Sequence, residues 1–154
     1  MPEEHSTKIG GSSAARVIAC PGSLPRSAKI PDSTSEYARE GYPQIKIYSS
    51  IEPEWVKPIA AEVHAHGMRL SGHIPSYMTA RQAVLDGYDE IQHINMLFLN
   101  FLAGPEDDTR TPVRFSLVAE RAGDLDLDSQ AVAEFIGLLR DRGVVVDPTV
   151  TIFD

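Results

Sequence analysis

Length, composition and charge already exclude several classes of protein. The chain has 154 residues, 42% of them hydrophobic and 23% charged, which is typical of a globular domain with a buried core. A complete (β/α)8 barrel needs about 200–250 residues, so the chain is too short to form one. Its formal net charge of −8, with no cluster of lysine and arginine, argues against nucleic-acid binding, which usually requires a basic face.

Membrane insertion and disulfide bonding are also not expected. The longest uncharged run, Ile91–Pro105, contains polar residues and is shorter than the roughly 18 apolar residues of a spanning helix. The first residues are acidic and no apolar segment follows them, unlike a signal peptide, so the default location is the cytoplasm. The single cysteine, Cys20, predicts an ordinary free thiol.

The chain divides by composition near residue 40. Residues 1–40 are rich in Ser, Gly and Pro and predict a weakly ordered segment, in which only Ala14–Cys20 is suited to a short strand. Residues 41–154 alternate short apolar runs with amphipathic runs and predict a separate folded domain.

Strands and helices are expected to alternate along this second part. The expected strands are Gln44–Tyr48, Met68–Ile74, Asp89–Ile94 and Val144–Asp147. The expected helices are Glu54–His66, Thr79–Asp86, Val113–Arg121 and Ser129–Arg142, with Ser129 as a cap and Gly67, Gly87 and Gly143 as stops. This alternation predicts βαβ units and a parallel sheet, which either winds doubly or curls toward a barrel.

Lys46 lies where an apolar strand would not carry a charge. Alternation places Lys46 and Tyr48 on one face of their strand and Ile45 and Ile47 on the other. Parallel sheets are usually covered on both faces, which would put Lys46 in a core or a barrel lumen. The alternative is an edge strand with Lys46 in water, and the sequence does not decide between the two.

Two histidines end consecutive predicted strands. His73 and His93 lie near the carboxyl ends of their strands, where α/β proteins gather their ligands. Their imidazoles could converge on one metal ion. The His64 and His66 pair instead falls in the last turn of a predicted helix, where residues two apart point in different directions, so both are expected to be surface or capping residues. His5 is given no role.

Three runs that contain these residues resemble a known family. The runs GYPQIKIYSS, AEVHAHGMRLSGHIP and DGYDEIQHINM resemble the middle of the metal-dependent amidohydrolase superfamily, in its imidazolonepropionase-like and prolidase-like branch. The resemblance implies an incomplete (β/α)8 TIM barrel that holds about strands 4–7. Residues 1–40 would then be either a weakly ordered segment or a remnant of the preceding barrel unit.

The same resemblance implies a metal site and a reaction. Lys46 matches a carboxylated lysine that bridges two ions, and His73 and His93 match ligands of the second ion. The cofactor would be one or two divalent metal ions, zinc by preference. The implied activity is hydrolysis of carbon–nitrogen bonds in amide, dipeptide-like or cyclic amide substrates by metal-activated water. Tyr48 and Asn95 would lie near the substrate.

The chain also departs from the family pattern. It has no strand-borne H-x-H pair and no strand-8 aspartate, and Asp147 matches strand 7, where it would be structural or near the substrate. We therefore expect a fragment of a hydrolase that is inactive alone and self-associates through exposed barrel edges. The alternatives are a non-catalytic half-barrel remnant and an α/β binding domain with incidental histidines. Residues Met96–Pro112 would form a substrate lid, a helix covering the core, or both.

Overall fold

A computed structural model describes residues 15–18 and 33–150. Its strands form one parallel sheet in the order in which they occur along the chain, which confirms the expected α/β class. The strands are β1 (Ala15–Ile18), β2 (Gln44–Ile47), β3 (Arg69–Gly72), β4 (Glu90–Gln92) and β5 (Val145–Asp147). The possible strand at Ala14–Cys20 is thus present as β1, whereas most of the segment 1–40 lies outside the described residues.

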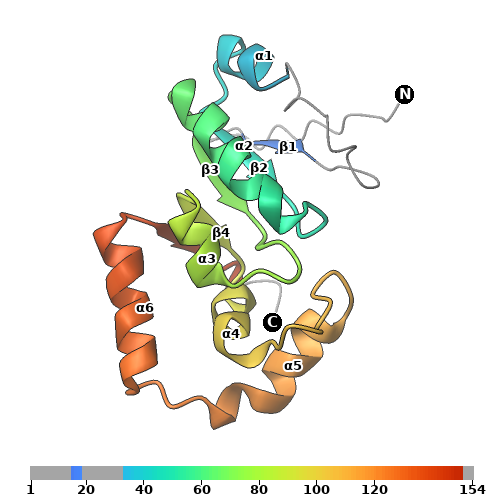
Figure 1. Cartoon of the computed structure of the whole chain (residues 1–154), viewed down its shortest axis with the longest axis vertical. Helices are drawn as coiled ribbons and strands as arrows, with labels where there is room; N and C mark the ends of the chain where they lie inside the picture. The colour runs from blue at the N-terminus through green and yellow to red at the C-terminus, as the bar shows by residue number, and fades with distance from the viewer. Residues whose placement is uncertain (1–14, 19–32, 151–154) are drawn as a thin grey trace.

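Helices connect the strands, so that each crossover is a helical unit (Figure 1). The helices are α1 (Ser33–Arg39), α2 (Pro53–Ala65), α3 (Ala80–Leu85), α4 (Asn95–Leu102), α5 (Val113–Arg121), the 3-10 turn η1 (Ala122–Asp124) and α6 (Gln130–Asp141). Ser129 caps α6 as expected, its hydroxyl accepting from the Val132 amide. Gly67 follows the end of α2 with φ of +70°, the left-handed conformation of a helix C-terminal stop.

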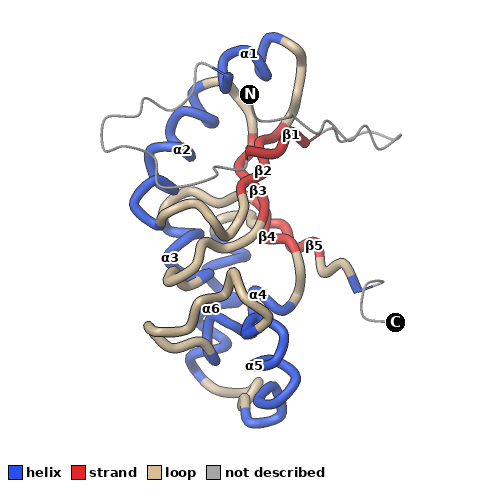
Figure 2. Tube along the Cα trace, turned by 90° about the vertical axis from the view of Figure 1, so that its right-hand side faces the viewer, coloured by secondary structure: helices blue, strands red, loops and turns tan. Residues whose placement is uncertain are grey.

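The helices lie on one side of the sheet (Figure 2). The strand residues that face them are apolar, and Ile45, Ile47, Leu70 and Ile91 are each 0% exposed. Val56 and Val63 of α2 are also fully buried and belong to the same cluster. The helix-covered face is therefore the hydrophobic core of the described structure, and the alternation in QIKI correctly predicts which isoleucines enter it.

The opposite face of the sheet is polar and carries no helix among those described (Figure 2). The strand register places Lys46 beside Ser71, Ser71 beside Glu90, and Glu90 beside Val145. Partners in a parallel ladder point to the same face, so a lysine, a serine and a glutamate form one row across three strands. This row leads toward the carboxyl edge of the sheet, where the candidate site lies.

Gly72 allows β2 and β3 to approach each other closely. Its φ is +128°, and a β-carbon added there would collide with the carbonyl oxygen of Ile47. Only glycine adopts this conformation without strain. Gly72 is the last residue of β3, so this close approach fixes where the next residue, His73, leaves the strand.

The outer strands of the sheet are β1 and β5, and no further strand pairs with them in the described part of the chain. The expected self-association through sheet edges stays a prediction, with these two strands as the edges concerned. No helix within residues 15–18 and 33–150 is long and apolar enough to cross a membrane.

Candidate functional site

His73 and His93 meet at the carboxyl edge of the sheet. Their Nε2 atoms are 2.7 Å apart, and their ring centroids are separated by 4.6 Å. Each follows directly after its strand, and each backbone amide extends the ladder: His73 N–H donates to the Ile47 carbonyl and His93 N–H to the Asp147 carbonyl. The expected convergence of these two imidazoles is therefore present, because adjacent parallel strands end at the same edge.

The backbone of His93 is strained. Its φ is +72°, the left-handed region that few non-glycine residues adopt, although Asn, Asp and His enter it more often than the others. The ring is held by Thr149, whose Oγ1 lies 2.6 Å from His93 Nδ1, and Thr149 itself has φ of +45°. Strained residues of this kind concentrate at functional sites, where the surrounding structure maintains them.

The environment keeps both imidazoles neutral. Burial lowers the pKa of His73 from 6.5 to about 3, assisted by repulsion from His93 in its protonated form and from the charges of Lys46 and Arg114. Burial also lowers the pKa of His93, followed by the charge of Lys46, while Asp147 acts in the opposite direction. Metal ligation requires the neutral imidazole, so both rings are in the ligating form at neutral pH.

One nitrogen of His73 has no hydrogen-bond partner. The side chain is 7% exposed, and its Nδ1 is a buried polar atom without a partner in the described structure. Such atoms are uncommon in folded proteins and need an explanation. Nearby, the hydroxyl of Tyr88 donates to the His73 carbonyl oxygen at 2.6 Å, which holds the backbone of this residue in place.

Lys46 lies on the same face as the histidine pair. Strand β2 pairs with β1 and β3, so the alternative of an edge strand is wrong and Lys46 is half-buried. Its Nζ is 5.2 Å from the centroid of the Tyr48 ring, which in turn lies 4.6 Å from the His73 ring. Burial lowers the pKa of Lys46, opposed by the charges of Asp147 and Glu90.

A small pocket opens beside the histidines. It has a volume of about 90 Å³ and is lined by His73, His93, Asn95, Met96, Arg114 and Phe115. Asn95 is buried, and its Nδ2 donates to the Arg114 carbonyl, while its Oδ1 has no partner in the described structure. The expectation that Asn95 lies near a ligand remains a prediction, now with a pocket that it lines.

The residues fit half of a metal centre. Within residues 15–18 and 33–150, no group of three or more His, Cys, Asp or Glu side chains could hold an ion. A catalytic zinc commonly uses three protein ligands in tetrahedral geometry, and His73 and His93 supply two neutral imidazoles. Tetrahedral ligation separates two ligand nitrogens by about 3.3 Å, so ion binding would require the rings to move apart slightly.

His64 and His66 have local partners, as expected for surface residues, while His5 lies outside the described residues. His64 Nε2 lies 2.8 Å from Asp89 Oδ2, and His66 Nε2 lies 3.2 Å from Glu62 Oε1. Asp89 also accepts a hydrogen bond from the Leu70 amide at 2.7 Å. The HAH pair therefore points to two different carboxylates and does not form a site.

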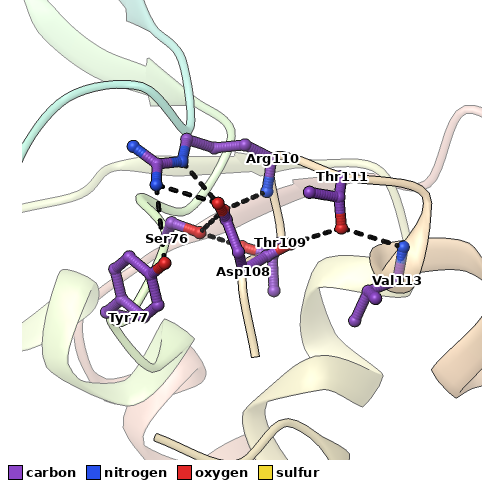
Figure 3. A network of polar contacts seen from close by, with 7 residues as sticks. All are labelled: Ser76, Tyr77, Asp108, Thr109, Arg110, Thr111 and Val113. Atoms are coloured by element: carbon purple, nitrogen blue, oxygen red, sulfur yellow. Dashed lines mark hydrogen bonds and ion pairs between the residues drawn. The ribbon is translucent and has the colours of Figure 1, made fainter. Parts of the chain in front are cut away.

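The segment Met96–Pro112 covers the core with its first part, as expected, while its role as a substrate lid stays a prediction. Its first part belongs to α4, and its later part is a loop fixed to the turn after β3 (Figure 3). The buried Ser76 donates to Asp108 Oδ1 at 2.7 Å, and Arg110 pairs with both Asp108 oxygens at 2.8 Å. Hydrogen bonds from Arg110 and Ser76 hold the pKa of Asp108 well below its usual value, so this anchor stays charged.

Two residues of the site have no signal in the sequence pattern. Thr149 follows the last strand, and Arg114 lies on an amphipathic helix distant in the chain from both histidines. Asp147 is exposed at the end of β5, and its Oδ1 accepts from the Thr149 amide at 3.1 Å. The carboxylate thus supports the turn that carries Thr149, in accord with the structural role expected for it.

The sequence matches no family model, and comparisons with curated proteins and with solved structures give no significant match. The amidohydrolase resemblance therefore stays a prediction from the sequence runs that contain Lys46, His73 and His93.

Proposed function

We propose that the chain carries part of the metal site of an amidohydrolase-type hydrolase that acts on carbon–nitrogen bonds. The observation that carries the proposal is the meeting of His73 and His93 at the ends of consecutive parallel strands. The lowered pKa values of both rings, which follow mainly from burial, are compatible with ligation by neutral imidazoles, and the positive φ of His93 is of a kind that gathers at functional sites.

The sheet supports an incomplete (β/α)8 barrel as the scaffold. Doubly wound sheets reverse their strand order and carry helices on both faces, whereas barrel strands keep sequential order with helices outside. The order β1-β2-β3-β4-β5 and the helices on one side agree with the second pattern (Figure 2). The polar face of the sheet then corresponds to the lumen, and the five strands to barrel strands 3–7.

Lys46 is suited to the role of a carboxylated lysine. Carbamate formation with CO2 requires the unprotonated amine, and burial lowers the pKa of Lys46 in that direction. The carbamate would provide an oxygen ligand on the same face as the two histidines. Tyr48, packed between Lys46 and His73, would exclude water from one side of the site.

A divalent ion held here would acidify a water molecule and polarise a substrate carbonyl. Thr149 Oγ1 contacts His93 Nδ1; in the tautomer with the proton on Nδ1, Thr149 would accept it and leave the Nε2 lone pair free for an ion. The remaining ligands of a complete centre would come from a further segment or chain, and we propose no turnover by the described residues alone.

Metal analysis tests this proposal. After dialysis against micromolar zinc, we expect close to one bound zinc for each chain. The double variant His73→Ala/His93→Ala should lose it, while His64→Ala/His66→Ala, which removes the same number of imidazoles outside the site, should retain it. Equal zinc content in the wild type and the His73/His93 variant would refute the proposal.

A non-catalytic domain is the second candidate. It is favoured by one observation, which is that the two imidazoles already satisfy each other through the short Nε2–Nε2 contact. If this candidate is correct, the wild type should bind zinc no more tightly than the His73→Ala/His93→Ala variant does. It should also show no carbamate signal by 13C NMR in 13C-bicarbonate. A signal that Lys46→Arg abolishes would support the hydrolase site instead.

A further inference from the structure

The pocket beside the two histidines is also lined by a sulfur-containing side chain. Met96 lines it together with His73 and His93, and the residue is 2% exposed. It lies three residues after His93, in the first turn of α4, and its amide donates to the His93 carbonyl oxygen at 3.0 Å. The backbone therefore holds Met96 beside the histidine pair.

The two imidazoles and the thioether form a set of neutral ligands, one of which is soft. Zinc in proteins is bound by thiolates, imidazoles and carboxylates, whereas a methionine thioether selects Cu(I), for which imidazole is also a suitable ligand. None of the described residues that line the pocket is acidic, so the lining provides no carboxylate oxygen for a hard ion. Methionine has three rotatable bonds, which allow its sulfur to adjust to an ion bound at the two Nε2 atoms.

The charges around the pocket favour a monovalent ion over a divalent one. Arg114 lines the pocket, and Arg114 and Lys46 both place positive charge near the two imidazoles. Asp147 acts in the opposite direction on His93, but its Oδ1 already accepts from the Thr149 amide. Because neutral ligands do not offset the charge of an ion, its repulsion from the two cations increases with that charge. A single positive charge is therefore the less unfavourable one in this pocket.

We infer that His73, His93 and Met96 form a binding site for Cu(I), with two imidazole nitrogens and one thioether sulfur as ligands. The two Nε2 atoms, which are 2.7 Å apart, would have to separate slightly to admit the ion, as they would for zinc. The inference goes beyond the proposed function, because it requires neither a carbamate on Lys46 nor a ligand from a further segment or chain.

Competition with a chromogenic Cu(I) chelator, in anaerobic buffer with ascorbate, tests the inference on the full chain. Every protein carries Cys20→Ser, which removes the single thiol, and we expect one Cu(I) for each chain. Met96→Leu should lower the Cu(I) affinity by at least about tenfold, since loss even of a group that only supports a ligand costs about 10–100-fold. Met78→Leu is the matched control, because Met78 packs against the core and is not among the residues that line the pocket.

X-ray absorption at the copper edge provides a measurement that does not depend on the folding of a variant. The Cu(I)-loaded Cys20→Ser protein should show one sulfur ligand beside nitrogen ligands. Coordination by nitrogen alone would overturn the inference. Equal Cu(I) affinity of Met96→Leu and Met78→Leu would also overturn it, as would equal affinity of the Cys20→Ser protein with and without His73→Ala/His93→Ala.

Zinc binding by the same proteins separates this inference from the proposed function. Met96→Leu should leave the zinc affinity unchanged, because a thioether is not a usual zinc ligand, whereas His73→Ala/His93→Ala should lose both ions. Cu(I) binding without zinc binding would refute the proposed function alone. Zinc binding without Cu(I) binding would refute the Cu(I) site alone.

Discussion

The two faces of the sheet use the same short strands for different purposes. On the helix-covered face, strands β2, β3 and β4 contribute side chains such as Ile45, Leu70 and Ile91 that exclude water completely. On the other face, the same strands present Lys46 and Glu90, and they lead at their ends to His73 and His93. The first face stabilises the fold by apolar burial, while the second carries groups whose burial is unfavourable. Alternate residues of the same strand therefore serve different purposes: one set stabilises the fold, and the other set leads toward the candidate site.

Substitution of Gly72 should have the largest effect, because it affects both faces. Gly72→Ala places a β-carbon against the Ile47 carbonyl at a φ that alanine does not tolerate, so we expect a loss of more than about 4 kcal/mol in the free energy of unfolding. Gly137→Ala is the control, since Gly137 lies within α6 with open space around it, and alanine there should be neutral or stabilising. Urea unfolding measures both, and a tolerated Gly72→Ala would contradict the close approach of the strands.

Adjacent residues of β2 provide the direct comparison of the faces. Ile47→Ala should cost about 2–5 kcal/mol, as expected for a fully buried aliphatic side chain. Lys46→Met keeps the length of the side chain and removes a partly desolvated charge, so its effect should stay within about 1 kcal/mol. Similar losses in the free energy of unfolding for Ile47→Ala and Lys46→Met would show that both faces of the sheet contribute equally to stability.

The histidine pair should make stability depend on pH. Between pH 6.5 and about 3, the unfolded chain binds a proton at His73 that the folded chain does not. The free energy of unfolding therefore decreases as the pH falls through this window, by up to about 1.4 kcal/mol per pH unit from this residue. In urea unfolding with EDTA, His73→Gln should show a shallower decrease than the wild type from pH 7 to about pH 5. Parallel curves would mean that His73 is not buried as a neutral ring.

At Thr149 we expect an effect on metal affinity and little effect on folding. Thr149→Val keeps the branched shape and removes the oxygen that contacts His93 Nδ1, so zinc affinity should fall by about tenfold. The 15N spectrum should show His93 in a mixture of tautomers, with the signals of His64 unchanged as an internal reference. Unaltered His93 signals would show that Thr149 does not orient the ring.

Local patterns predict the described fold well. The alternation in QIKI and the apolar spacing around Val56 and Val63 depend on neighbours in the chain, and both correctly indicate the buried face. Helix α5 is found with the expected bounds. The meeting of His73 and His93 could also be predicted, because parallel strands that follow one another end at the same edge.

The rest of the site depends on contacts between distant segments. Whether Lys46 lies on an edge strand is decided by the pairing of β1 with β2, which alternation within QIKI cannot determine. Arg114 reaches the pocket from α5, and Ser76 binds Asp108 across 32 positions of the chain. Hydrophobic periodicity predicts which face of each helix is buried, but it does not predict which other element packs against that face.

The left-handed backbone of His93 also bears on how the chain would change under mutation. Glycine would adopt φ of +72° at lower cost than histidine, because it has no β-carbon. Random substitution under selection for folding alone would therefore favour glycine at position 93. An imidazole kept there in place of glycine makes position 93 a sensitive indicator of whether related sequences still use the site.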